Sequence, residues 1–508
     1  MRLATTLTRA QLGLKAPEVV VEAHVGGGLP QFNIIGLIET AVRESRDRVR
    51  AAISQSGLAF PDGRITVNLA PADLPKGGSG FDLATAIAIL AASGQVRPER
   101  LATIEFHGEL ALSGALRRVP GLWPALMAAR RSGRSAVVPS AGETEATLLG
   151  GAGICLADQL LDVVRYLNGT GELRAPAAAP VVVAASPLCS EDLADVRGQA
   201  QARHALEVAA AGGHHLLFTG PPGTGKTMLA RRLPGLLPEM SESEALESAA
   251  VYSLAGGITG FRQRPFRSPH HTASTAAMVG GGGNPRPGEI SMAHHGVLFL
   301  DELPEFSRPV LEALREPLGT GQVTIARALR TVEYPAAFQL VAAMNPCPCG
   351  FAGDQTEACR CTPEQVRRYQ LKVSGPLLDR MDLVVSVSRA GLGDSVSGDG
   401  HPGVESSAVV RIRIAAAVAR QRARADVLNA RLDAAGLREH CQLPADGQAL
   451  LEMAAQRFAL SARALDSARR VARTLADLSG DAFISRAHLA EALSLRADRG
   501  KGDGLIAG

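Results

Sequence analysis

The sequence predicts a multidomain α/β protein whose central domain holds a parallel sheet with a nucleotide site at its edge. Its 508 residues are enough for about three domains at roughly 150 residues each. Residues 220–227 fit the phosphate-loop pattern G-x-x-x-x-G-K-[S/T], and residues 296–302 read as a buried apolar strand ending in two carboxylates. Open α/β sheets bind ligands at the carboxyl ends of their strands, so both segments are expected at that edge.

The phosphate loop lies in the chain context that its chemistry needs. A buried strand is predicted at 214–219 and a helix starting at 228–233. Glycines let backbone N–H groups surround phosphates, and a helix N-terminus attracts negative charge. Lys226 is expected at the β- and γ-phosphates and the Thr227 hydroxyl on Mg²⁺. A glycine turn without function is the alternative, which the strand–loop–helix context disfavours. The loop residues are Gly220, Pro221, Pro222, Gly223, Thr224, Gly225, Lys226 and Thr227.

Two acidic residues follow the second apolar strand. We expect Asp301 to hold the Mg²⁺ ion and Glu302 to orient or deprotonate the attacking water. An Asp-Glu pair after a strand is, by itself, usually a solvated strand end. Together with the phosphate loop it indicates an ATP-hydrolysis site, with ATP and Mg²⁺ as cofactors.

The composition is that of a globular protein without membrane segments. The chain is 46% hydrophobic and 20% charged, no apolar run is long enough to cross a membrane, and the N-terminus leads into no signal-peptide core. We therefore expect a cytoplasmic protein with no membrane partner. The net charge of +3 is too small to indicate a nucleic-acid partner by itself.

Two low-complexity stretches divide the chain into three segments. Residues 169–186 are rich in Gly, Ala and Pro, and residues 389–403 in Gly, Ser and Asp, so both are expected to be linkers or mobile loops. The predicted organisation is a first domain at 1–168, a linker at 169–189, an ATPase core at 190–388, a flexible loop at 389–403 and a helical domain at 404–498.

The two outer segments differ in their periodicity. Ser461 and Ser485 precede two predicted C-terminal helices and are N-cap candidates. In the first segment we expect strands at 19–24 and 65–69 and helices at 38–56, 81–92 and 124–132. In the last we expect helices at 406–432, 447–458, 461–478 and 485–495.

Further motifs are spread over almost the whole chain. They are NIIGL (33–37), DLPKGGSGFDL (73–83), RSPHHT (267–272), GVLFLDELPEF (296–306), MNPCPCG (344–350) and SGPLLDRMD (374–382). Together they resemble the ComM/YifB family of magnesium-chelatase-like AAA+ ATPases. The resemblance implies a Lon-protease-like N-terminal domain, a AAA+ core related to magnesium chelatases and MCM helicases, and a helical C-terminal lid. It also implies a homo-hexameric ring that acts on DNA, by helicase action or branch migration, in natural transformation and recombination.

The resemblance assigns three more residues to nucleotide chemistry. Asn345 ends an apolar strand and matches the sensor that positions the attacking water, with a polar strand end as the alternative. Arg380 matches the arginine finger, which reaches the γ-phosphate of a neighbouring subunit. A salt bridge from Arg380 to Asp379 or Asp382 is the alternative. Arg463 matches the sensor arginine of the lid, although arginines on helical faces are common.

A DNA contact is expected at a β-hairpin. Residues 322–334 alternate as a hairpin does and resemble the pore-lining hairpin of MCM-type rings. Arg327 and Arg330 near its tip are predicted to contact a phosphate backbone without reading its sequence. The alternative is an exposed hairpin with solvated arginines.

Four clustered cysteines form a candidate metal site. Cys347, Cys349, Cys359 and Cys361 make a Cys-x-Cys…Cys-x-Cys set. Four thiolates suit tetrahedral Zn²⁺, which would stiffen the loop after Asn345. Reduced thiols or a redox pair are equal alternatives, and an iron–sulfur cluster is a weaker one.

Two histidine pairs, His270–His271 and His294–His295, flank a glycine run at 280–283. A metal site is the sharper interpretation of four histidines. We favour the plainer one, in which they order a loop near the active site or contact DNA.

A Lon-like domain raises a second function, which is ATP-dependent proteolysis by a Ser–Lys dyad. The segment around Ser79 resembles the Lon nucleophile loop, with one residue fewer before the serine. Trp123 stands where the lysine is expected, and a serine without a base is a poor nucleophile. We predict a non-proteolytic domain, with Lys76 as a remote alternative base.

The leading prediction is an ATP-driven ring motor on single-stranded or branched DNA. The main alternative is a chelatase-type ATPase that remodels a protein partner. The C-terminal segment lacks the D-x-S-x-S adhesion motif that would favour this alternative.

Overall fold

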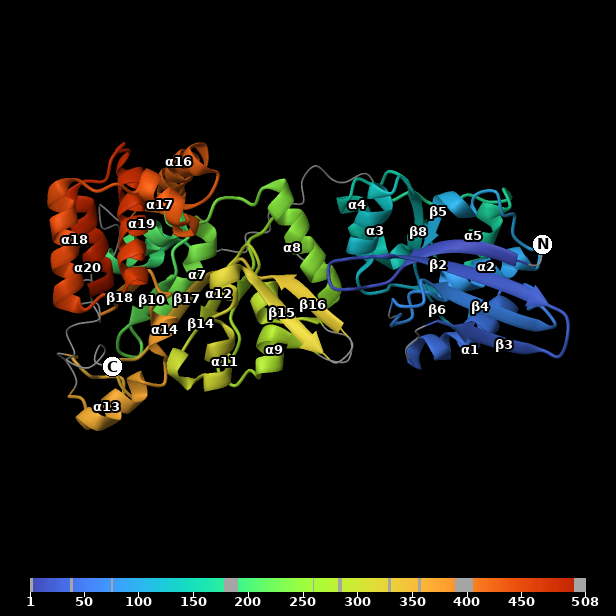
Figure 1. Ribbon diagram of the computed structural model, residues 1–508, viewed down its shortest axis with the longest axis horizontal. Coiled ribbons are helices and arrows are strands. Elements are labelled where there is room, and N and C mark those ends of the chain that lie inside the picture. The colour runs from blue at the N-terminus through green and yellow to red at the C-terminus, as the bar shows by residue number, and fades with distance from the viewer. Residues whose placement is uncertain are drawn as a thin grey trace.

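The computed structural model consists of two α/β bodies side by side along the long axis, with a block of helices at the far end of the second body (Figure 1). The first body is formed by the N-terminal third of the chain, and the second by residues 191–388 and the C-terminal helices. None of the described helices is long and apolar enough to cross a membrane. The structure describes residues 3–36, 40–74, 76–177, 191–258, 260–281, 286–327, 330–354, 358–388 and 405–497.

The N-terminal body is built on a seven-stranded mixed sheet with the order β3-β4-β2-β1-β5-β8-β9. Burial alternates along its longer strands because successive side chains point to opposite faces. A separate pair, β6 (Glu109–Leu110) and β7 (Leu116–Arg117), lies outside this sheet. The sheet strands are β1 (Leu3–Arg9), β2 (Glu18–Gly26), β3 (Gln31–Ile35), β4 (Arg64–Ala70), β5 (Ile104–Phe106), β8 (Ser135–Pro139) and β9 (Ile154–Ala157).

One helix of this body, α2 (Asp82–Ala92), is buried on every side. Its sequence is apolar all round after Asp82, and such a helix is stable only when it is enclosed. It packs on β1 and β2, and α1 (Thr40–Gln55) packs on it in turn. The other helices are α3 (Leu122–Arg131), α4 (Glu143–Leu148) and α5 (Leu160–Leu167).

The second body is built on a five-stranded parallel sheet with the order β11-β14-β17-β10-β18. The inner strands are continuous apolar runs, which is typical of a parallel sheet covered on both faces. Because all strands run the same way, their carboxyl ends share one edge and their amino ends the other. The strands are β10 (Leu216–Thr219), β11 (Phe266–Arg267), β14 (Val297–Leu300), β17 (Gln339–Met344) and β18 (Leu383–Ser386).

Two excursions leave this sheet. One is the hairpin of β15 (Gln322–Arg327) and β16 (Arg330–Pro335), and the other is a short pair, β12 (Gly280–Gly281) and β13 (Arg286–Pro287). The helices of the segment are α6 (Ala200–Gly212), α7 (Lys226–Leu236), α8 (Glu242–Ala255), α9 (Thr275–Val279), α10 (Glu289–Met292), α11 (Arg308–Ala313), α12 (Pro317–Thr320), α13 (Pro363–Gln370) and α14 (Gly375–Leu378).

The C-terminal helices share one hydrophobic core with the parallel sheet. Ile414, Val471 and Leu489 belong to the same buried cluster as Phe218 of β10. Two predicted N-caps are confirmed, since the Ser461 hydroxyl accepts from Ala464 N and the Ser485 hydroxyl from His488 N. The helices are α16 (Ser407–Ala425), α17 (Ala434–His440), α18 (Ala445–Phe458), α19 (Ala462–Ser479) and α20 (Arg486–Ala497).

The two bodies meet where α3 packs on α8. Trp123 of α3 is 1% exposed, lies in one apolar cluster with Ala249 of α8, and donates its backbone N–H to Ser253 Oγ at 3.2 Å. The residue that replaces the expected Lon lysine therefore packs between the bodies. The Ser79 hydroxyl instead donates to Glu109, and the buried Lys76 ammonium donates to the carbonyl of Pro71.

Two segments differ from the sequence-based expectation. Residues 169–177, predicted to begin the linker, run along the first body, where Leu156 N donates to Arg174 O at 2.8 Å and Arg174 pairs with Glu143. The predicted helix 406–432 ends at Ala425 because Asp426 takes a left-handed conformation with φ 55°. Residues 178–190 and 389–404, which hold the rest of the linker and the flexible loop, lie outside the described residues.

Candidate nucleotide-hydrolysis site

The phosphate loop joins β10 to α7 at the carboxyl edge of the parallel sheet. Gly220 approaches β18 so closely that a Cβ atom there would lie 2.2 Å from the carbonyl oxygen of Val387. Gly225 has φ 87°, a left-handed conformation that glycine adopts at little cost, and precedes the first residue of α7. These two positions explain why the loop needs glycine at its beginning and end.

The Lys226 side chain folds back inside the loop. Its Nζ donates to the carbonyl oxygens of Gly220 and Pro221, each at 2.7 Å, and to Asn345 Oδ1 at 3.1 Å. Burial lowers the pKa of Lys226, while the carboxylates of Asp301 and Glu302 act to raise it. The ammonium group is thus oriented by the loop and by the predicted sensor residue, where phosphate oxygens can meet it.

The predicted Mg²⁺ ligands lie in direct contact. Thr227 lies at the start of α7, and Asp301 directly follows β14. The Thr227 hydroxyl donates to Asp301 Oδ2 at 2.6 Å. A hydroxyl oxygen and a carboxylate oxygen at this separation fit the hard oxygen ligands that Mg²⁺ prefers beside substrate phosphates. Both residues are therefore suited to hold the ion that the sequence predicts.

Glu302 has an unusual backbone at the end of β14. Its φ is 53°, in the left-handed region that non-glycine residues seldom adopt, and its N–H donates to Asp301 Oδ1 at 3.0 Å. The side chain is 53% exposed, and its Oε2 lies 3.3 Å from His271 Nδ1. The structure thus brings Lys226, Thr227, Asp301, Glu302 and Asn345 to one edge of the sheet, as predicted.

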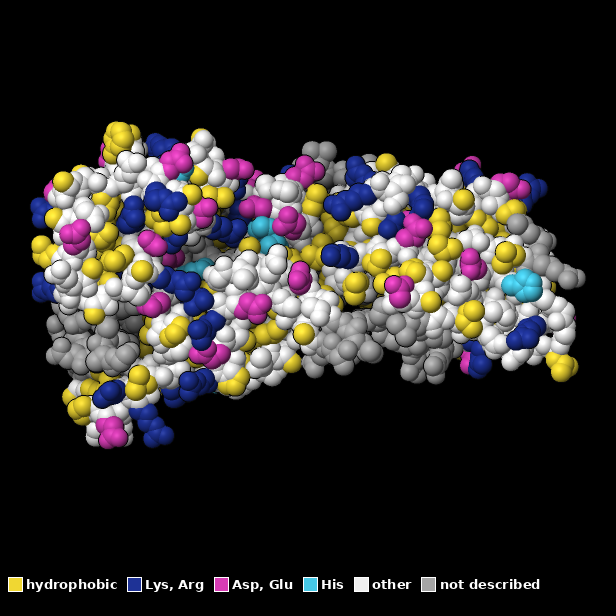
Figure 2. All heavy atoms as spheres, in the orientation of Figure 1, with side chains coloured by type: hydrophobic (Ala, Val, Ile, Leu, Met, Phe, Trp, Pro, Cys, Tyr) yellow, Lys and Arg dark blue, Asp and Glu magenta, His cyan; other side chains and the backbone are white. Residues whose placement is uncertain are grey.

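Arg380 and Arg463 lie elsewhere, in a cleft of about 780 Å³. The cleft also contains His215, Gln339 and Asp382, which stand at the amino ends of β10, β17 and β18. The cleft therefore opens at the sheet edge opposite the phosphate loop. Figure 2 shows basic and histidine side chains around a hollow between the C-terminal helices and α8. The arginines that line it are Arg264, Arg380, Arg422, Arg431, Arg463 and Arg470.

Arg380 lies among these arginines of the cleft. Its Nη1 donates to Pro376 O at 2.9 Å, and burial followed by repulsion from Arg463 lowers its pKa. Asp382, one of the alternative partners, is engaged otherwise, since its carboxylate accepts from His215 N at 3.0 Å and from Ser467 Oγ at 2.5 Å. A crowded guanidinium in an arginine-rich cleft is suited to an anion from outside the subunit.

A second candidate metal cluster borders the same cleft. His294 Nε2 and His295 Nε2 lie 3.2 Å and 2.8 Å from Glu247 Oε2. The backbone N–H of Ala337 donates to His294 Nδ1 at 3.0 Å, so the neutral ring carries its hydrogen on Nε2 and donates it to Glu247. His294 then has no lone pair free for a metal. Hydrogen bonds from His294 lower the pKa of Glu247 to about 2, in accord with a hydrogen-bonded cluster.

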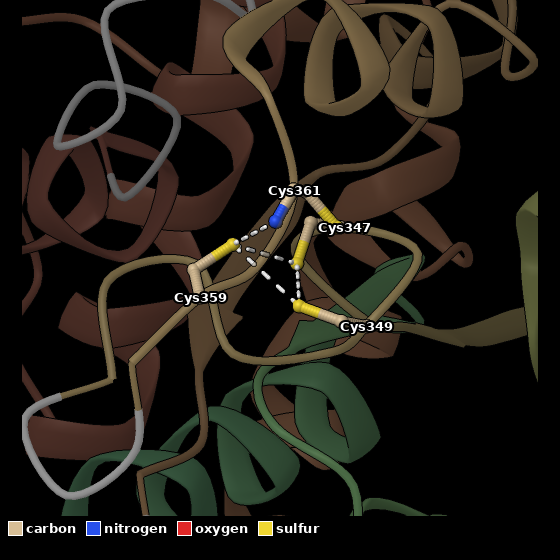
Figure 3. Close-up of side chains that lie close together, drawn as sticks. All are labelled: Cys347, Cys349, Cys359 and Cys361. Atoms are coloured by element: carbon tan, nitrogen blue, oxygen red, sulfur yellow. Dashed lines mark hydrogen bonds between the residues drawn. The ribbon is translucent and has the colours of Figure 1, made fainter.

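The four predicted cysteine ligands lie close together, with their side chains gathered around one point (Figure 3). Their sulfur atoms all lie within 4.8 Å of one another. Cys347 Sγ is 3.3 Å from Cys349 Sγ and 3.6 Å from Cys359 Sγ. The same loop contacts the phosphate loop, because a Cβ on Gly350 would lie 2.6 Å from the ring of Pro222.

The predicted DNA hairpin is present as β15 and β16. Arg327 and Arg330 form its last described pair, and the positions of their side chains lie outside the described part of the structure. At the base, Val323 and Tyr334 are buried in the core of the second body. Packing in that core therefore fixes the base of the hairpin.

Comparisons with known proteins agree with this architecture. Three family profiles match: magnesium chelatase subunit ChlI over residues 192–394, subunit ChlI of Mg-chelatase over 21–142, and the ChlI C-terminal family over 404–496. The uncharacterized protein YifB of Escherichia coli is 50% identical over 501 residues, which cover 98% of this chain and 97% of YifB. Competence protein ComM of Haemophilus influenzae is 48% identical over 505 residues, 98% of each chain.

A shorter similarity concerns the N-terminal body. Lon protease 2 of Bacillus subtilis is 33% identical over 121 residues, 22% of each chain. The fold and site define a AAA+ nucleotide-binding protein with a Lon-like N-terminal domain. More narrowly, the chain belongs to the ComM/YifB family of magnesium-chelatase-like AAA+ ATPases.

Proposed function

We propose that this protein is an ATP-hydrolysing ring motor that acts on DNA, as a helicase or in branch migration. The observation that carries the proposal is the division of the site between two edges of one sheet. The Lys226–Asn345 and Thr227–Asp301 contacts lie at one edge, and Arg380 and Arg463 line the cleft at the other. A second copy of the chain is needed to bring both halves to one nucleotide.

The chemistry is phosphoryl transfer to water. Lys226 binds the β- and γ-phosphate oxygens, and Thr227 and Asp301 would hold Mg²⁺, which when bound offsets phosphate charge. Asn345 orients the attacking water, and Glu302 accepts its proton or its hydrogen bond. Arg380 of the neighbouring copy stabilises the negative charge of the transition state, with Arg463 beside it. Repetition of this head-to-tail contact closes a ring, which we propose to be a homo-hexamer.

DNA is the proposed substrate because of the hairpin and the relatives. Arg327 and Arg330 form the last described pair of a β-hairpin whose base packs in the core. Two guanidinium groups at this end of the hairpin suit a phosphate backbone. One relative of nearly equal length is named a competence protein, which supports a role in transformation. A protein-remodelling ATPase of the chelatase type is the second candidate, supported by the magnesium-chelatase family match over residues 192–394.

The steady-state ATPase rate separates these two functions. It is measured without DNA and with single-stranded, duplex and four-way-junction DNA, at low and moderate salt. The motor predicts strong stimulation that weakens with salt and is greatest on forked or junction DNA. A rate that no DNA changes contradicts the motor and favours a protein partner.

We further propose that Cys347, Cys349, Cys359 and Cys361 hold a structural Zn²⁺ ion. Zn–S bonds of about 2.3 Å in a tetrahedron require sulfur atoms about 3.8 Å apart, close to the observed separations. The Ala352 backbone N–H also donates to Cys347 Sγ at 3.3 Å, which holds this sulfur atom in place within the cluster.

The zinc content of protein purified without chelators tests this assignment. We expect one zinc per chain, its loss in Cys347→Ser, and its retention in the matched control Cys155→Ser. Protein without zinc, which also fails to develop thiolate–cobalt absorption with Co²⁺, contradicts the site.

A further inference from the structure

The connection between β1 and β2 extends beyond the sheet of the first body as an arm, residues 10–17. Leu12 and Lys15 exchange two backbone hydrogen bonds, at 2.9 Å and 3.0 Å, in the same register as the β1–β2 pair. Gly13 begins the two-residue turn at the tip, and its φ of 59° suits the first central position of a type II′ turn. The arm is therefore a hydrogen-bonded ribbon up to its tip.

A buried ion pair anchors the base of the arm in the first body. Arg9, the last residue of β1, donates from Nε to Glu105 Oε2 at 2.8 Å and from Nη2 to Glu105 Oε1 at 2.7 Å. Glu105 belongs to β5 and is fully buried. The same guanidinium donates to the carbonyl oxygen of Ala16 in the arm at 3.0 Å. Because a bidentate pair fixes direction as well as distance, the arm leaves the first body in a defined direction.

The tip of the arm packs against the hairpin of β15 and β16 in the second body. Figure 1 shows the dark blue loop between β1 and β2 reaching this hairpin. A Cβ atom on Gly13 would lie 2.5 Å from Val332 Cγ1 and 3.8 Å from Tyr334 Cε1, so a larger residue would displace the Val332 side chain. Leu12 and Leu14 pack against the buried cluster that contains Val332 and Tyr334. The first body therefore touches the proposed DNA-binding element directly.

The hairpin is held on both of its strands. Ile325 of β15 and Val332 of β16 lie opposite each other and are buried. On the β15 side, a Cβ atom on Gly280 at the end of α9 would lie 2.9 Å from Ile325 Cδ1. On the β16 side, the arm packs on Val332. Arg327 and Arg330 belong to the same two strands, two positions further toward the tip, so these contacts fix the strands that carry them.

We propose that the arm is a positioning element, which supports the hairpin from the Lon-like body so that Arg327 and Arg330 meet the phosphate backbone of DNA in a fixed position. The inference rests on the proposed DNA motor and assigns its Lon-like body a task that needs no proteolysis. A hairpin that is fixed before DNA arrives loses less conformational entropy on binding, so the contact of the arm strengthens DNA binding without touching DNA.

The test removes the apolar side chains of the arm by combining Leu12→Ala with Leu14→Ala in the full chain. Amide hydrogen exchange of the DNA-free protein is expected to rise in β15 and β16 and to stay unchanged in β17. DNA affinity, measured by fluorescence anisotropy, is expected to weaken roughly threefold to tenfold, because the hairpin must then be ordered on binding. The slope of log affinity against log salt keeps its wild-type value, since both arginines remain. Leu29→Ala, at an exposed leucine in the turn after β2, is the matched control and keeps wild-type values.

Unchanged exchange in β15 and β16 of the double variant overturns the positioning role, and so does raised exchange with wild-type DNA affinity. A smaller salt slope also contradicts it, because the arm would then contact DNA itself. If the wild type binds no DNA, the motor function fails, and the exchange of β15 and β16 alone decides whether the arm holds the hairpin. If the double variant does not fold, Gly13→Ala decides. Its added methyl group meets Val332, so exchange in β16 is expected to rise, and wild-type exchange there contradicts the contact.

Discussion

At the residue scale, the site depends on side chains that constrain one another. Lys226 is oriented by Asn345, Thr227 by Asp301, and the backbone of Glu302 by the Asp301 carboxylate. Hydrogen bonds to charged groups are stronger than neutral ones, so each contact reduces the freedom of a catalytic group before substrate arrives.

Glu302→Gln tests the role of the predicted catalytic carboxylate. The amide cannot accept a proton, so hydrolysis is expected to fall by about two orders of magnitude or more while ATP binding persists. The rate and the affinity are measured by steady-state ATPase and by fluorescent nucleotide binding. Glu305→Gln, which changes a residue paired with Lys372 nearby, is the control. Hydrolysis at the wild-type rate in Glu302→Gln contradicts the assignment.

A second residue-scale prediction concerns stability against acid. Burial lowers the pKa of His295 from 6.5 to about 4. The unfolded state therefore binds more protons between these pH values, and stability present above pH 6.5 is lost as the pH falls toward 4. The glutamine of His295→Gln cannot be protonated in this pH range. Between pH 7 and pH 5 the melting temperature of this variant should therefore fall less than that of the wild type. Equal losses contradict the prediction.

The residues of the site were predictable from sequence where they follow strands directly. Thr227, Asp301 and Asn345 come within one position of a predicted strand end or loop, so the pattern gives both identity and place. The His271–Glu302 contact was not predictable, because it joins the ends of two strands far apart in the chain. Its only sequence signal was a histidine pair just after Arg267, whose strand β11 spans only two residues.

At the scale of elements, local signals gave the helices and the hairpin, and packing set their limits. The alternating residues 322–334 form the predicted hairpin, and Ser461 begins α19 as predicted. The break between α16 and α17 could not be predicted, because it depends on a left-handed residue and on Leu432 and Leu437 entering the shared core. Tertiary packing set the boundary between α16 and α17, which helix propensity alone could not predict.

The hairpin makes the element-scale prediction. Arg327→Ala combined with Arg330→Ala removes two phosphate contacts, so the slope of log affinity against log salt should fall by about 2. The DNA-free ATPase rate should be unchanged, because the base of the hairpin in the core is untouched. DNA affinity is measured by fluorescence anisotropy over a salt series, with Arg438→Ala in α17 as the control. An unchanged salt slope contradicts the DNA contact.

At the scale of the whole molecule, the two bodies and the two halves of the site form one arrangement. Trp123 ties the Lon-like body to α8, and α8 carries Glu247 at the border of the arginine-rich cleft. The general fold class followed from motifs along the chain. The separation of Arg380 from the phosphate loop required the three-dimensional sheet, because only strand direction shows which edge each residue occupies.

The central claim is that one nucleotide is hydrolysed between two copies of the chain. Its most direct test mixes equal amounts of Lys226→Ala and Arg380→Ala subunits, each inactive alone. A phosphate loop from one variant then meets an arginine from the other, and roughly a quarter of the interfaces in a randomly mixed ring regain both halves. We predict that ATPase activity returns to about that fraction of wild type. Full activity of Arg380→Ala by itself, or no recovery in mixed rings of normal size, would contradict the shared site.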